Sequence, residues 1–427
     1  MSEAVGLTLL GVDVRALAQS VTARPDLIDS LSEPFHRSSR RPLLGIDCFG
    51  DQDARAACDA FIRVARCSAD ALADAAIDGA AGVAPNLFHG GRVRADLIVG
   101  GGLDARPDLL RRLSGRYRLR GNGPEIADVL VDPPRWFGLL DRLGIAYPPV
   151  TADRPVVPKG WLLKHAASCG GQGVISANAD AVLNADCVTA PDAYFQRQVA
   201  GGVVSAVFIA DGCNARIIGF NRLNCEVTGQ RPYQYAGAIV WAGPSTEQRR
   251  IIGGWVEGLT RALELRGING IDLILPALGQ SACDAAPADR NPLLLELNAR
   301  PTATVELHAE RLPGGAVHCH LEACDGRLPA MSSPPQATTA SAALRGCRVL
   351  YAPHPITTRH CDWPAWCRDQ PAPGTRIGVG EPVCSVSAQG TDAVEVERLL
   401  RQRAAAIFRS IADPTTYAAD APNTRAA

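Results

Sequence analysis

The first hundred residues alternate short apolar runs with segments of helical periodicity, and this alternation constrains the fold more than any other feature of the sequence. The apolar runs are Leu7–Gly11, Pro42–Asp47 and Ala95–Val99, and three glycines, Gly100–Gly102, follow the last of them. Apolar strands that each lead into a helix are typical of a parallel, doubly wound sheet, which binds ligands at the carboxyl ends of its strands. The glycine triplet is therefore a candidate site, although it lacks the G-x-G-x-x-G fingerprint and an ordinary tight turn explains it more simply.

The composition excludes several classes of protein. Of the 427 residues, 47% are hydrophobic and 20% are charged, which is enough apolar material for several packed domains. The 43 basic and 44 acidic residues nearly cancel, whereas binding to a nucleic-acid backbone usually requires a basic excess. The 14 cysteines are scattered, and we see neither an export signal nor an apolar run long enough to cross a bilayer. We therefore expect a cytoplasmic protein with reduced thiols and with no nucleic-acid or membrane partner.

Beyond residue 121 the pattern changes to mixed helix and strand. Glu125–Leu143 predicts a helix that is interrupted at Pro133. Before residue 121, Ala54–Ile77 is rich in alanine and also predicts a helix. Val394–Ile411 predicts a final helix. Leu328–Ala343 has the composition of a linker, so we expect a separate domain after it.

Only two of the 43 basic residues are lysines, Lys159 and Lys164, and both lie close to a glycine-rich segment. Trp161–Lys164 predicts a short strand, and Ser168–Gly173 contains three glycines. A strand would hold the compact ammonium group in a fixed place, and the backbone N–H groups of a glycine loop can fold over phosphates. Together the lysine and the loop favour a nucleotide site, whereas the loop by itself is equally typical of a hairpin turn.

Tyr194–Gly202 predicts a strand that ends in a turn. Its free backbone donors and acceptors, next to apolar side chains, suit an adenine ring. Taken in isolation, an edge strand followed by a turn is the simpler interpretation.

The strongest signal is a pair of strands that carry charged residues near their ends. Glu296 and Asn298 are two residues apart and therefore point to the same face of a strand, while Asp272 lies on a neighbouring predicted strand. Carboxylate and amide oxygens suit Mg²⁺, which is commonly held by a few carboxylates together with substrate phosphates. Arg300 would face the same way and could bind a phosphate with both arms of its guanidinium. The alternative is a salt bridge between Glu296 and Arg300 at the end of the strand.

His318, Cys319, His320 and Cys324 are metal-binding residue types at close spacing. They lack the C-x-x-C pair that is typical of zinc sites. We therefore interpret them as structural residues.

Taken in this order, the motifs resemble the ATP-grasp superfamily of ATP-dependent carboxylate–amine ligases. The resemblance covers essentially the whole chain and implies an α/β and α+β fold with a Rossmann-like leading domain, a two-lobed ATP-grasp domain and a small β-rich C-terminal domain. The implied boundaries are 1–122 for the leading domain, 123–198 for the small lobe, 199–328 for the large lobe with the metal site, 329–345 for a linker and 346–427 for the tail with its final helix.

The resemblance also implies ATP and Mg²⁺ as ligands and assigns roles to individual residues. Lys164 and Arg300 are the expected catalytic residues. Lys164 would also bind phosphates, Gly170, Gly171 and Gly173 would cover them, and Gln196 and Val199 would flank the adenine. The expected metal ligands are Asp272, Glu296 and Asn298. Arg222, Arg231 and Tyr233 are weaker candidates for contact with an anionic substrate.

Within the superfamily, several segments look like those of enzymes that build one-carbon carrier coenzymes of the methanofuran or tetrahydromethanopterin type, of which tyramine–glutamate ligase is a relative. These segments are Val14–Ala18, Asp47–Asp53, Asn298–Ala303, Pro373–Ile377 and Gly380–Cys384. The implied reaction joins a small-molecule carboxylate to an amine through an acyl phosphate, with a homodimer as the candidate assembly. An ATP-grasp carboxylase, an ATP-grasp kinase and a non-catalytic ATP-binding scaffold remain the alternatives.

Overall fold

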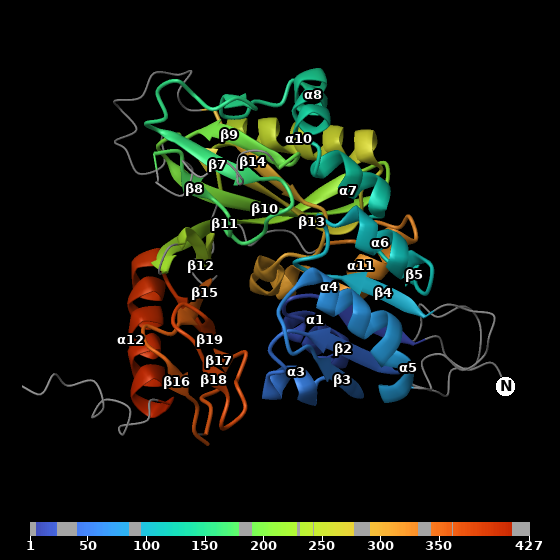
Figure 1. Cartoon of the computed structure of the whole chain (residues 1–427), viewed down its shortest axis with the longest axis vertical. Coiled ribbons are helices and arrows are strands. Elements are labelled where there is room, and N and C mark those ends of the chain that lie inside the picture. The colour runs from blue at the N-terminus through green and yellow to red at the C-terminus, as the bar shows by residue number, and fades with distance from the viewer. Residues whose placement is uncertain are drawn as a thin grey trace, which may run out of the picture.

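The computed structural model describes residues 6–23, 41–84, 95–178, 190–228, 231–241, 243–276, 291–331, 343–360 and 362–411. These residues form an N-terminal α/β part, a central part with two sheets, and a C-terminal part that lies beside the N-terminal one (Figure 1). The predicted fold class, mixed α/β with a parallel first sheet, is confirmed. Residues 332–342, within the predicted linker, and residues 412–427, at the end of the tail, lie outside the described residues.

The N-terminal sheet is parallel and has the strand order β3-β2-β1-β4-β5. Its strands are β1 (Leu7–Leu10), β2 (Leu43–Asp47), β3 (Ala60–Arg63), β4 (Asp96–Val99) and β5 (Arg118–Leu119). Its helices are α1 (Arg15–Ala23), α3 (Gln52–Ala56), α4 (Ala69–Asp74), α5 (Ala80–Val83), which a π-helical turn (Ala75–Gly79) joins to α4, and α6 (Pro107–Ser114). Because helices cover both faces, β1 and β2 are buried at every position, which is why their sequences are apolar throughout.

The predicted helix over Ala54–Ile77 is wrong in its middle. Ala60–Arg63 forms the edge strand β3, which pairs in parallel with β2. Its Phe61 and Ile62 pack against the helices on the two faces of the sheet. Pairing with β2 and the partial burial of these two side chains outweigh the local helical preference of the alanines around them.

The small lobe combines two helices with a four-stranded antiparallel sheet of order β6-β9-β7-β8. The helices are α7 (Pro124–Leu130) and α8 (Pro133–Leu143), and the strands are β6 (Val150–Thr151), β7 (Trp161–His165), β8 (Ile175–Ser176) and β9 (Ala193–Arg197). The predicted interruption at Pro133 is confirmed, because α8 starts there and the Asp132 side chain accepts a hydrogen bond from the Arg135 N–H. Gly144 ends α8 with a φ of 65°.

The large sheet has eight strands in the order β14-β13-β10-β11-β12-β15-β19-β17. They are β10 (Gly202–Asp211), β11 (Ala215–Thr228), β12 (Arg231–Trp241), β13 (Arg266–Leu275), β14 (Leu293–Asn298), β15 (Leu344–Tyr351), β17 (Cys367–Arg368) and β19 (Pro382–Gly390). Strands β15, β19 and β17 belong to the predicted tail, so one sheet runs through the large lobe and the tail. The tail also contains the short pair β16 (Ile356–Thr357) and β18 (Arg376–Ile377), and α12 (Ala393–Ile411).

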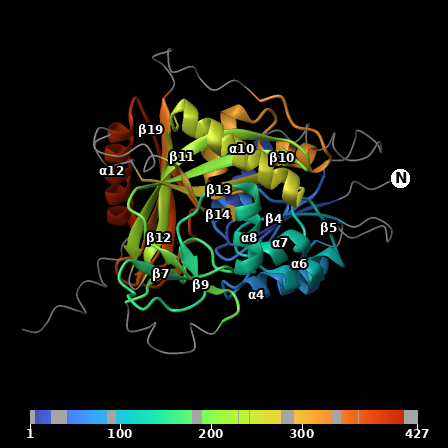
Figure 2. The same ribbon diagram turned by 90° about the horizontal axis from the view of Figure 1, so that it is seen from above.

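Helices cover both faces of the large sheet, as the view from above shows (Figure 2). Alternate residues of β10 explain this arrangement: Ala206 and Phe208 pack in the same core as α10 (Thr246–Leu263), whereas Val207 packs with α11 (Ala316–Cys324). A 3₁₀ segment, Ala303–Arg311, joins β14 to α11. None of the described helices has the length and hydropathy that a bilayer crossing requires.

Candidate functional site

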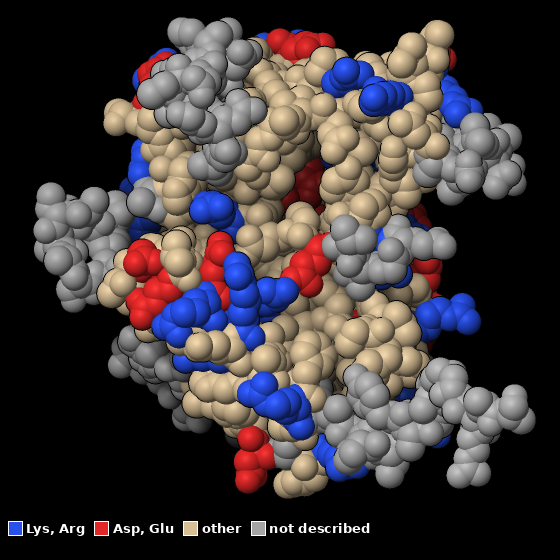
Figure 3. Space-filling view, turned by 90° about the vertical axis from the view of Figure 1, so that its left-hand side faces the viewer, with Lys and Arg blue, Asp and Glu red and all other residues tan. Residues whose placement is uncertain are grey.

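A cavity of about 470 Å³ lies between the two lobes and reaches the loop that follows β4. This volume suits a small-molecule site. The cavity brings together most of the residues singled out in the sequence: Lys164, Gly170, Gly171, Gln196, Val199, Tyr233, Asp272, Glu296, Asn298 and Arg300. The space-filling view shows the molecule hollowed on this side, with acidic side chains deep in the hollow (Figure 3).

The acidic floor of the cavity comes from two paired strands. Asp272 on β13 lies directly opposite Glu296 on β14, and Gly270 lies opposite Asn298. The Asn298 amide nitrogen donates to Asp272 Oδ2 at 3.4 Å and to Glu296 Oε1 at 3.5 Å. Burial, and then the adjacent Glu296, raise the pKa of Asp272 well above its usual value. The fold therefore places two acidic side chains side by side on the cavity floor, where a bound cation would stabilise both carboxylates.

This donor set fits a hard divalent cation. Two carboxylates and an amide are the ligand types that Mg²⁺ accepts, with substrate phosphates completing the shell. Asp272, Glu296 and Asn298 would hold the ion, which requires the Asn298 amide oxygen, now bonded to Arg300, to turn toward it. Among the described residues, no three His, Cys, Asp or Glu side chains converge on one point, so a cation at this site depends on Asn298 and on ligand oxygens in addition to the two acids.

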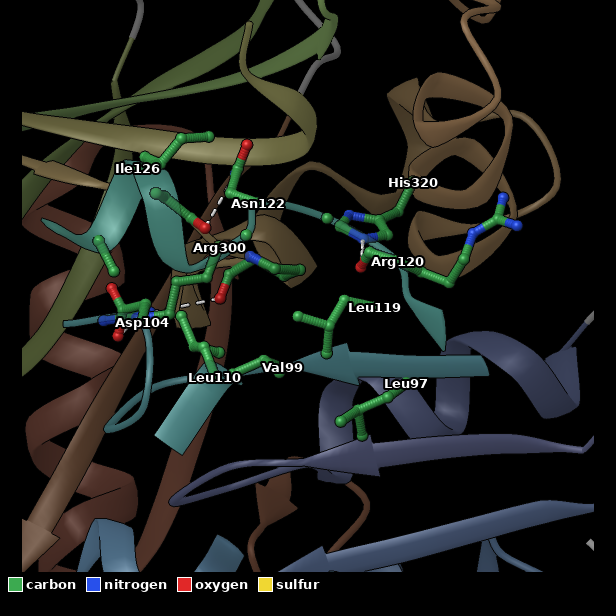
Figure 4. A pocket seen from close by; sticks show the side chains of 15 residues that line it. Leu97, Val99, Asp104, Leu110, Leu119, Arg120, Asn122, Ile126, Arg300 and His320 are labelled. Atoms are coloured by element: carbon green, nitrogen blue, oxygen red, sulfur yellow. Dashed lines mark hydrogen bonds and ion pairs between the residues drawn. The ribbon is translucent and has the colours of Figure 1, made fainter. Parts of the chain in front are cut away.

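Arg300 follows β14 and is held from three directions. One arm of its guanidinium donates to Asn298 Oδ1 at 3.0 Å and the other donates to the Pro301 carbonyl at 3.3 Å. Its Nε lies 3.1 Å from Asp104 Oδ1, so the loop after β4 reaches across to the large lobe (Figure 4). A Cβ on Gly101 would lie 3.5 Å from the guanidinium carbon, which shows how closely the glycine triplet approaches Arg300. The predicted alternative, a salt bridge between Glu296 and Arg300, does not occur among the ion pairs of the described residues.

Lys164 on β7 faces the acidic floor from the opposite lobe. Its Nζ donates to Gln196 Oε1 at 3.3 Å and lies 5.9 Å from the centre of the Tyr194 ring. Burial by itself would lower the pKa of Lys164, but Tyr194, Glu296 and Asp272 together raise it, so the ammonium is charged. Because an ammonium group can only donate, Gln196 must turn its amide nitrogen away from Lys164. That nitrogen is buried and has no partner among the described residues, which leaves it available to an acceptor on a ligand.

The glycine-rich segment lies against β12. Gly170, Gly171 and Gly173 have φ values of 62°, 76° and 75°, which only glycine adopts readily. A Cβ on Gly171 would lie 1.8 Å from the Tyr233 carbonyl oxygen, and the Tyr235 N–H donates to the Gly170 carbonyl at 3.3 Å. The segment is therefore a loop closely packed on the sheet, and Gly173 alone of its three glycines is absent from the described cavity lining.

An apolar wall faces the polar floor and suits the flat ring of a base. Trp136 and Phe137 of α8 line the cavity, as do Leu162 of β7 and Tyr194 of β9. The Phe137 and Tyr194 rings meet edge to face with their centres 5.3 Å apart. Sequence reasoning did not place α8 at this site, because its contribution depends on how the helix packs across the small-lobe sheet.

Of the three weaker candidates for substrate contact, only Tyr233 is among the described residues that line the cavity. The Tyr233 hydroxyl accepts a hydrogen bond from Gln198 Nε2 at 3.2 Å and lines the cavity. Arg222 on β11 and Arg231 at the start of β12 are exposed, and neither belongs to the described cavity lining. Adjacent residues of a strand point to opposite faces, and Leu223 is the one that lines the cavity, so Arg222 faces away from it.

Two polar features of the site were missed in the sequence. Asp104 pairs with Arg300, and the glycine triplet just before it was the only available signal. Ser205, in the cavity wall, accepts a hydrogen bond from Asn221 Nδ2 at 3.2 Å, and Asn221 Oδ1 lies 3.0 Å from His308 Nε2. Burial lowers the pKa of His308 to about 4, so this chain of side chains behind the site is neutral.

His320 lies at the junction between the leading domain and the large lobe (Figure 4). Its Nδ1 accepts from the Ile268 N–H at 2.9 Å, and its Nε2 lies 2.9 Å from the Arg120 carbonyl oxygen. Burial lowers its pKa to about 4. His320 is thus a neutral structural side chain, and Cys319 also makes a structural contact, to the Pro313 carbonyl at 3.2 Å. The cavity beside His320, about 20 Å³, has room for little more than one water molecule.

The chain is similar to known proteins both in part of its sequence and in its fold. Residues 137–304 match a sequence model of the ATP-grasp domain. A search of curated proteins found no match. The matched range begins in α8 and ends just after β14, so it contains Lys164, the glycine loop, the acidic floor and Arg300.

Several solved structures have a similar fold at low sequence identity. The biotin carboxylase domain of the Hydrogenobacter thermophilus 2-oxoglutarate carboxylase, a dimer in complex with MgADP, ADP and bicarbonate, has a TM-score of 0.64 at 12% identity, covering 96% of this chain and 91% of that one. The L-amino acid ligase from Bacillus licheniformis has a TM-score of 0.61 at 11% identity, with coverages of 96% and 98%. N5-carboxyaminoimidazole ribonucleotide synthetase from Thermus thermophilus has a TM-score of 0.60 at 14% identity, with coverages of 95% and 99%. Residues 137–304 are thus similar to the ATP-grasp domain, and the chain as a whole shares the fold of these carboxylase and ligase structures.

Proposed function

We propose that this chain is an ATP- and Mg²⁺-dependent ligase that joins a carboxylate to an amine through an acyl phosphate. The observation that carries the proposal is the single cavity in which Lys164, the glycine loop, the paired acids and Arg300 meet. A cation beside the two acids and a second cation across a cavity of this size are suited to a nucleotide triphosphate and its metal, and the apolar wall is suited to the base. The likeness to an L-amino acid ligase over nearly the whole chain supports the same reaction class.

In the proposed reaction a carboxylate oxygen of the substrate attacks the γ-phosphorus of ATP, and the bond to the bridging oxygen breaks to release ADP. The amine then attacks the carbonyl carbon of the acyl phosphate, phosphate leaves, and the amine loses a proton. Lys164 and Arg300 approach from opposite lobes and would stabilise the charge on the transferred phosphoryl group. A bound Mg²⁺ would neutralise phosphate charge between them.

Acyl phosphates hydrolyse in water, so the site must exclude solvent during the reaction. The glycine loop is placed to do this, because Gly170 and Gly171 line the cavity while Gly171 packs directly against Tyr233. Loops of this kind often close over a bound substrate.

The proposal extends to one-carbon coenzyme biosynthesis of the methanofuran or tetrahydromethanopterin type. Its support is the set of segments, such as Asp47–Asp53 and Pro373–Ile377, that look like those of that group. Glutamate with an aromatic primary amine is therefore the first substrate pair to test.

A carboxylase is the second candidate. It is supported by the fold, because the biotin carboxylase domain from Hydrogenobacter thermophilus aligns with 96% of this chain. In this reaction bicarbonate would take the place of the carboxylate substrate, so the same cavity could serve both chemistries.

The deciding experiment measures ADP release from ATP across a panel of amino acids crossed with amines, with bicarbonate as a separate arm. Glu296→Gln is the inactive variant, because it removes one acid from the cavity floor and keeps the side-chain shape. Glu247→Gln is the matched control, because Glu247 is 63% exposed on α10 and pairs there with the exposed Arg250. ADP that depends on both a carboxylate and an amine supports the ligase. ADP with bicarbonate alone supports the carboxylase, and equal ADP from wild type and Glu296→Gln in every arm rejects both.

A further inference from the structure

Five aspartates gather where the leading domain meets the tail, at the carboxyl ends of β1 and β2. Asp13 follows β1, Asp47 ends β2, Asp51 and Asp53 lie at the start of α3, and Asp369 comes from the tail. The tail is tied here by its backbone, because the Asp369 and Gln370 N–H groups each donate to Asp53 at 3.0 Å. In parallel doubly wound sheets, the carboxyl ends of the strands are where ligands bind.

Within the described part of the chain, the buried cation of this cluster already has partners. Among the described residues, Arg15 is 2% exposed and donates to both Glu306 oxygens, at 2.6 and 3.0 Å. Its Nε donates to Asp369 Oδ1 at 2.7 Å. Arg15 thus links the leading domain to the large lobe and the tail. The three nitrogens of its guanidinium bond to Glu306 and Asp369, and its backbone N–H donates to Asp13 Oδ1 at 2.9 Å.

Asp51 is the member that lacks a partner. Asp51 is only 6% exposed. Within the described part of the chain its carboxylate takes part in no hydrogen bond or ion pair, and it does not cap α3, although it occupies the N-cap position of that helix. Asp47 differs, because its Oδ1 accepts from the Phe49 and Gly50 N–H groups, while its Oδ2 is fully buried and has no partner among the described residues. A buried carboxylate without a partner is costly, and a ligand that brings positive charge removes the cost.

The electrostatics of the cluster favour the binding of a cation. Burial, and then Asp369, Asp13 and Asp47, raise the pKa of Asp51 to about 9. Burial of the carboxylate, and then Asp369, raise the pKa of Asp13 to about 8. Asp13 as a whole residue is exposed to solvent, so a ligand can reach the cluster from outside.

The arrangement suits an organic cation better than a metal ion. A metal ion needs several ligands around one point, and no three acidic or other metal-binding side chains among the described residues are placed in this way. An ammonium group presents N–H donors in several directions and can bond to carboxylates that are set apart.

The cluster adjoins the proposed catalytic site. A Cβ on Gly100 would lie 3.7 Å from the Asp13 carbonyl oxygen, and one on Gly101 would lie 3.5 Å from the Arg300 guanidinium carbon. The glycine triplet therefore lies between the Asp13 backbone and Arg300, and the five aspartates are not among the described residues that line the cavity.

We propose that Asp13 and Asp51, supported by Asp369, form a binding site for the ammonium group of a cationic amine substrate. The proposal rests on the ligase function proposed above and specifies its second substrate: an amine that arrives charged, such as a diamine or an amine with a second cationic group. The tail supplies one wall of this site through Asp369, so the site exists only when the tail is docked on the leading domain.

The test measures binding without turnover. Isothermal titration with 1,4-diaminobutane, in the absence of ATP and at fixed ionic strength, is compared for wild type, Asp51→Asn, Asp13→Asn and the surface control Glu247→Gln. We expect binding to wild type and to Glu247→Gln, and a loss of about tenfold or more in affinity for each aspartate variant, as removal of a charge-assisted hydrogen bond implies. 1-Butanol, which has no charge, and MgCl₂ serve as ligand controls.

Glu296→Gln separates this proposal from the proposed function. That variant lacks one acid of the nucleotide site but keeps the aspartate cluster, so it should bind 1,4-diaminobutane like wild type even if no ligase activity is ever found. Asp51→Asn removes only charge and should fold, which its thermal unfolding checks. The proposal is overturned if wild type does not bind the diamine, if the aspartate variants bind it equally well, or if 1-butanol or MgCl₂ gives the same heat.

Discussion

Arg300 Nε lies 3.1 Å from Asp104 Oδ1, and this ion pair joins the large lobe to the leading domain inside the candidate site. The Arg300 side chain is 13% exposed and that of Asp104 is 12% exposed, so solvent screens the pair only weakly. Arg300 is thus oriented by Asn298 from its own strand and by Asp104 from another domain. The position of the leading domain therefore bears directly on the geometry of a residue that we expect to be catalytic.

Replacing Asp104 should impair activity through Arg300. We expect Asp104→Asn to lower kcat by about tenfold, because a neutral amide holds the guanidinium less firmly, with a smaller change in the KM for ATP. Steady-state kinetics on the substrate pair found by the ADP screen measure both constants. Asp108→Asn is the control, because Asp108 is an exposed partner of Arg106 on α6. Equal kcat for the Asp104 variant and wild type would show that Asn298 alone orients Arg300.

Removing the charge of Lys164 or of Arg300 should reduce activity more than replacing Asp104. Lys164→Met and Arg300→Met retain much of the side-chain volume and lose the charge, and each should lower the rate by about 100-fold or more, as loss of one preorganised charge-stabilising group does. Lys159→Met is the control, since Lys159 is the other lysine of the chain and is not among the described residues that line the cavity. If all three variants have the same rate, neither Lys164 nor Arg300 contributes to catalysis as proposed.

The paired acids predict a dependence of stability on pH and on Mg²⁺. The pKa of Asp272 in the folded state is raised well above its usual value of 3.8, first by burial and then by Glu296. The folded state therefore holds a proton that the unfolded state releases, so without metal the stability should fall as the pH rises above about 4. Glu296→Gln should weaken this fall, and Mg²⁺ with ATP should stabilise wild type more than the variant. Thermal unfolding from pH 5 to 8, in EDTA and in MgATP, measures both effects; identical curves for the two proteins would contradict the pairing.

The glycine loop offers a comparison between two neighbouring positions. Gly170 and Gly171 both have positive φ, so alanine is strained at either one, but only the Gly171 Cβ would collide, at 1.8 Å from the Tyr233 carbonyl oxygen. We expect Gly171→Ala to weaken ATP binding by at least about tenfold and Gly170→Ala to have a clearly smaller effect. Titration with a non-hydrolysable ATP analogue measures both. Equal losses would mean that backbone strain, not the contact with β12, determines the position of the loop.

Cys67 should be the most reactive thiol among the described cysteines. It is exposed, and a hydrogen bond from Cys48 lowers its pKa below the usual 9.0, whereas burial raises the pKa of Cys58 and Cys169. Brief treatment with iodoacetamide near pH 7.5, followed by peptide mass spectrometry, should find Cys67 modified before the exposed Cys213. Cys48→Ala should slow this modification. Faster reaction at Cys213 would show that the hydrogen bond does not govern reactivity.

Features that depend on nearby residues could be predicted before the fold was known. Burial on both faces made β1 and β2 recognisable as apolar runs, Pro133 marked the start of α8, and the two-residue spacing of Glu296 and Asn298 placed them on one face of β14. Such signals are present in the amino-acid order because helix starts and strand faces are set by residues only a few positions apart.

Features that depend on contacts between distant segments emerged only in the folded molecule. Pairing with β2 made Ala60–Arg63 a strand despite its alanine-rich surroundings, and pairing with β12 placed the tail strand β15 in the large sheet. The contact of Asp104 with Arg300, and that of Asp369 with Arg15, join residues almost 200 and more than 350 positions apart. No periodicity or local preference records such contacts, because they arise only when separately folded parts pack together and bury charges that must then find partners.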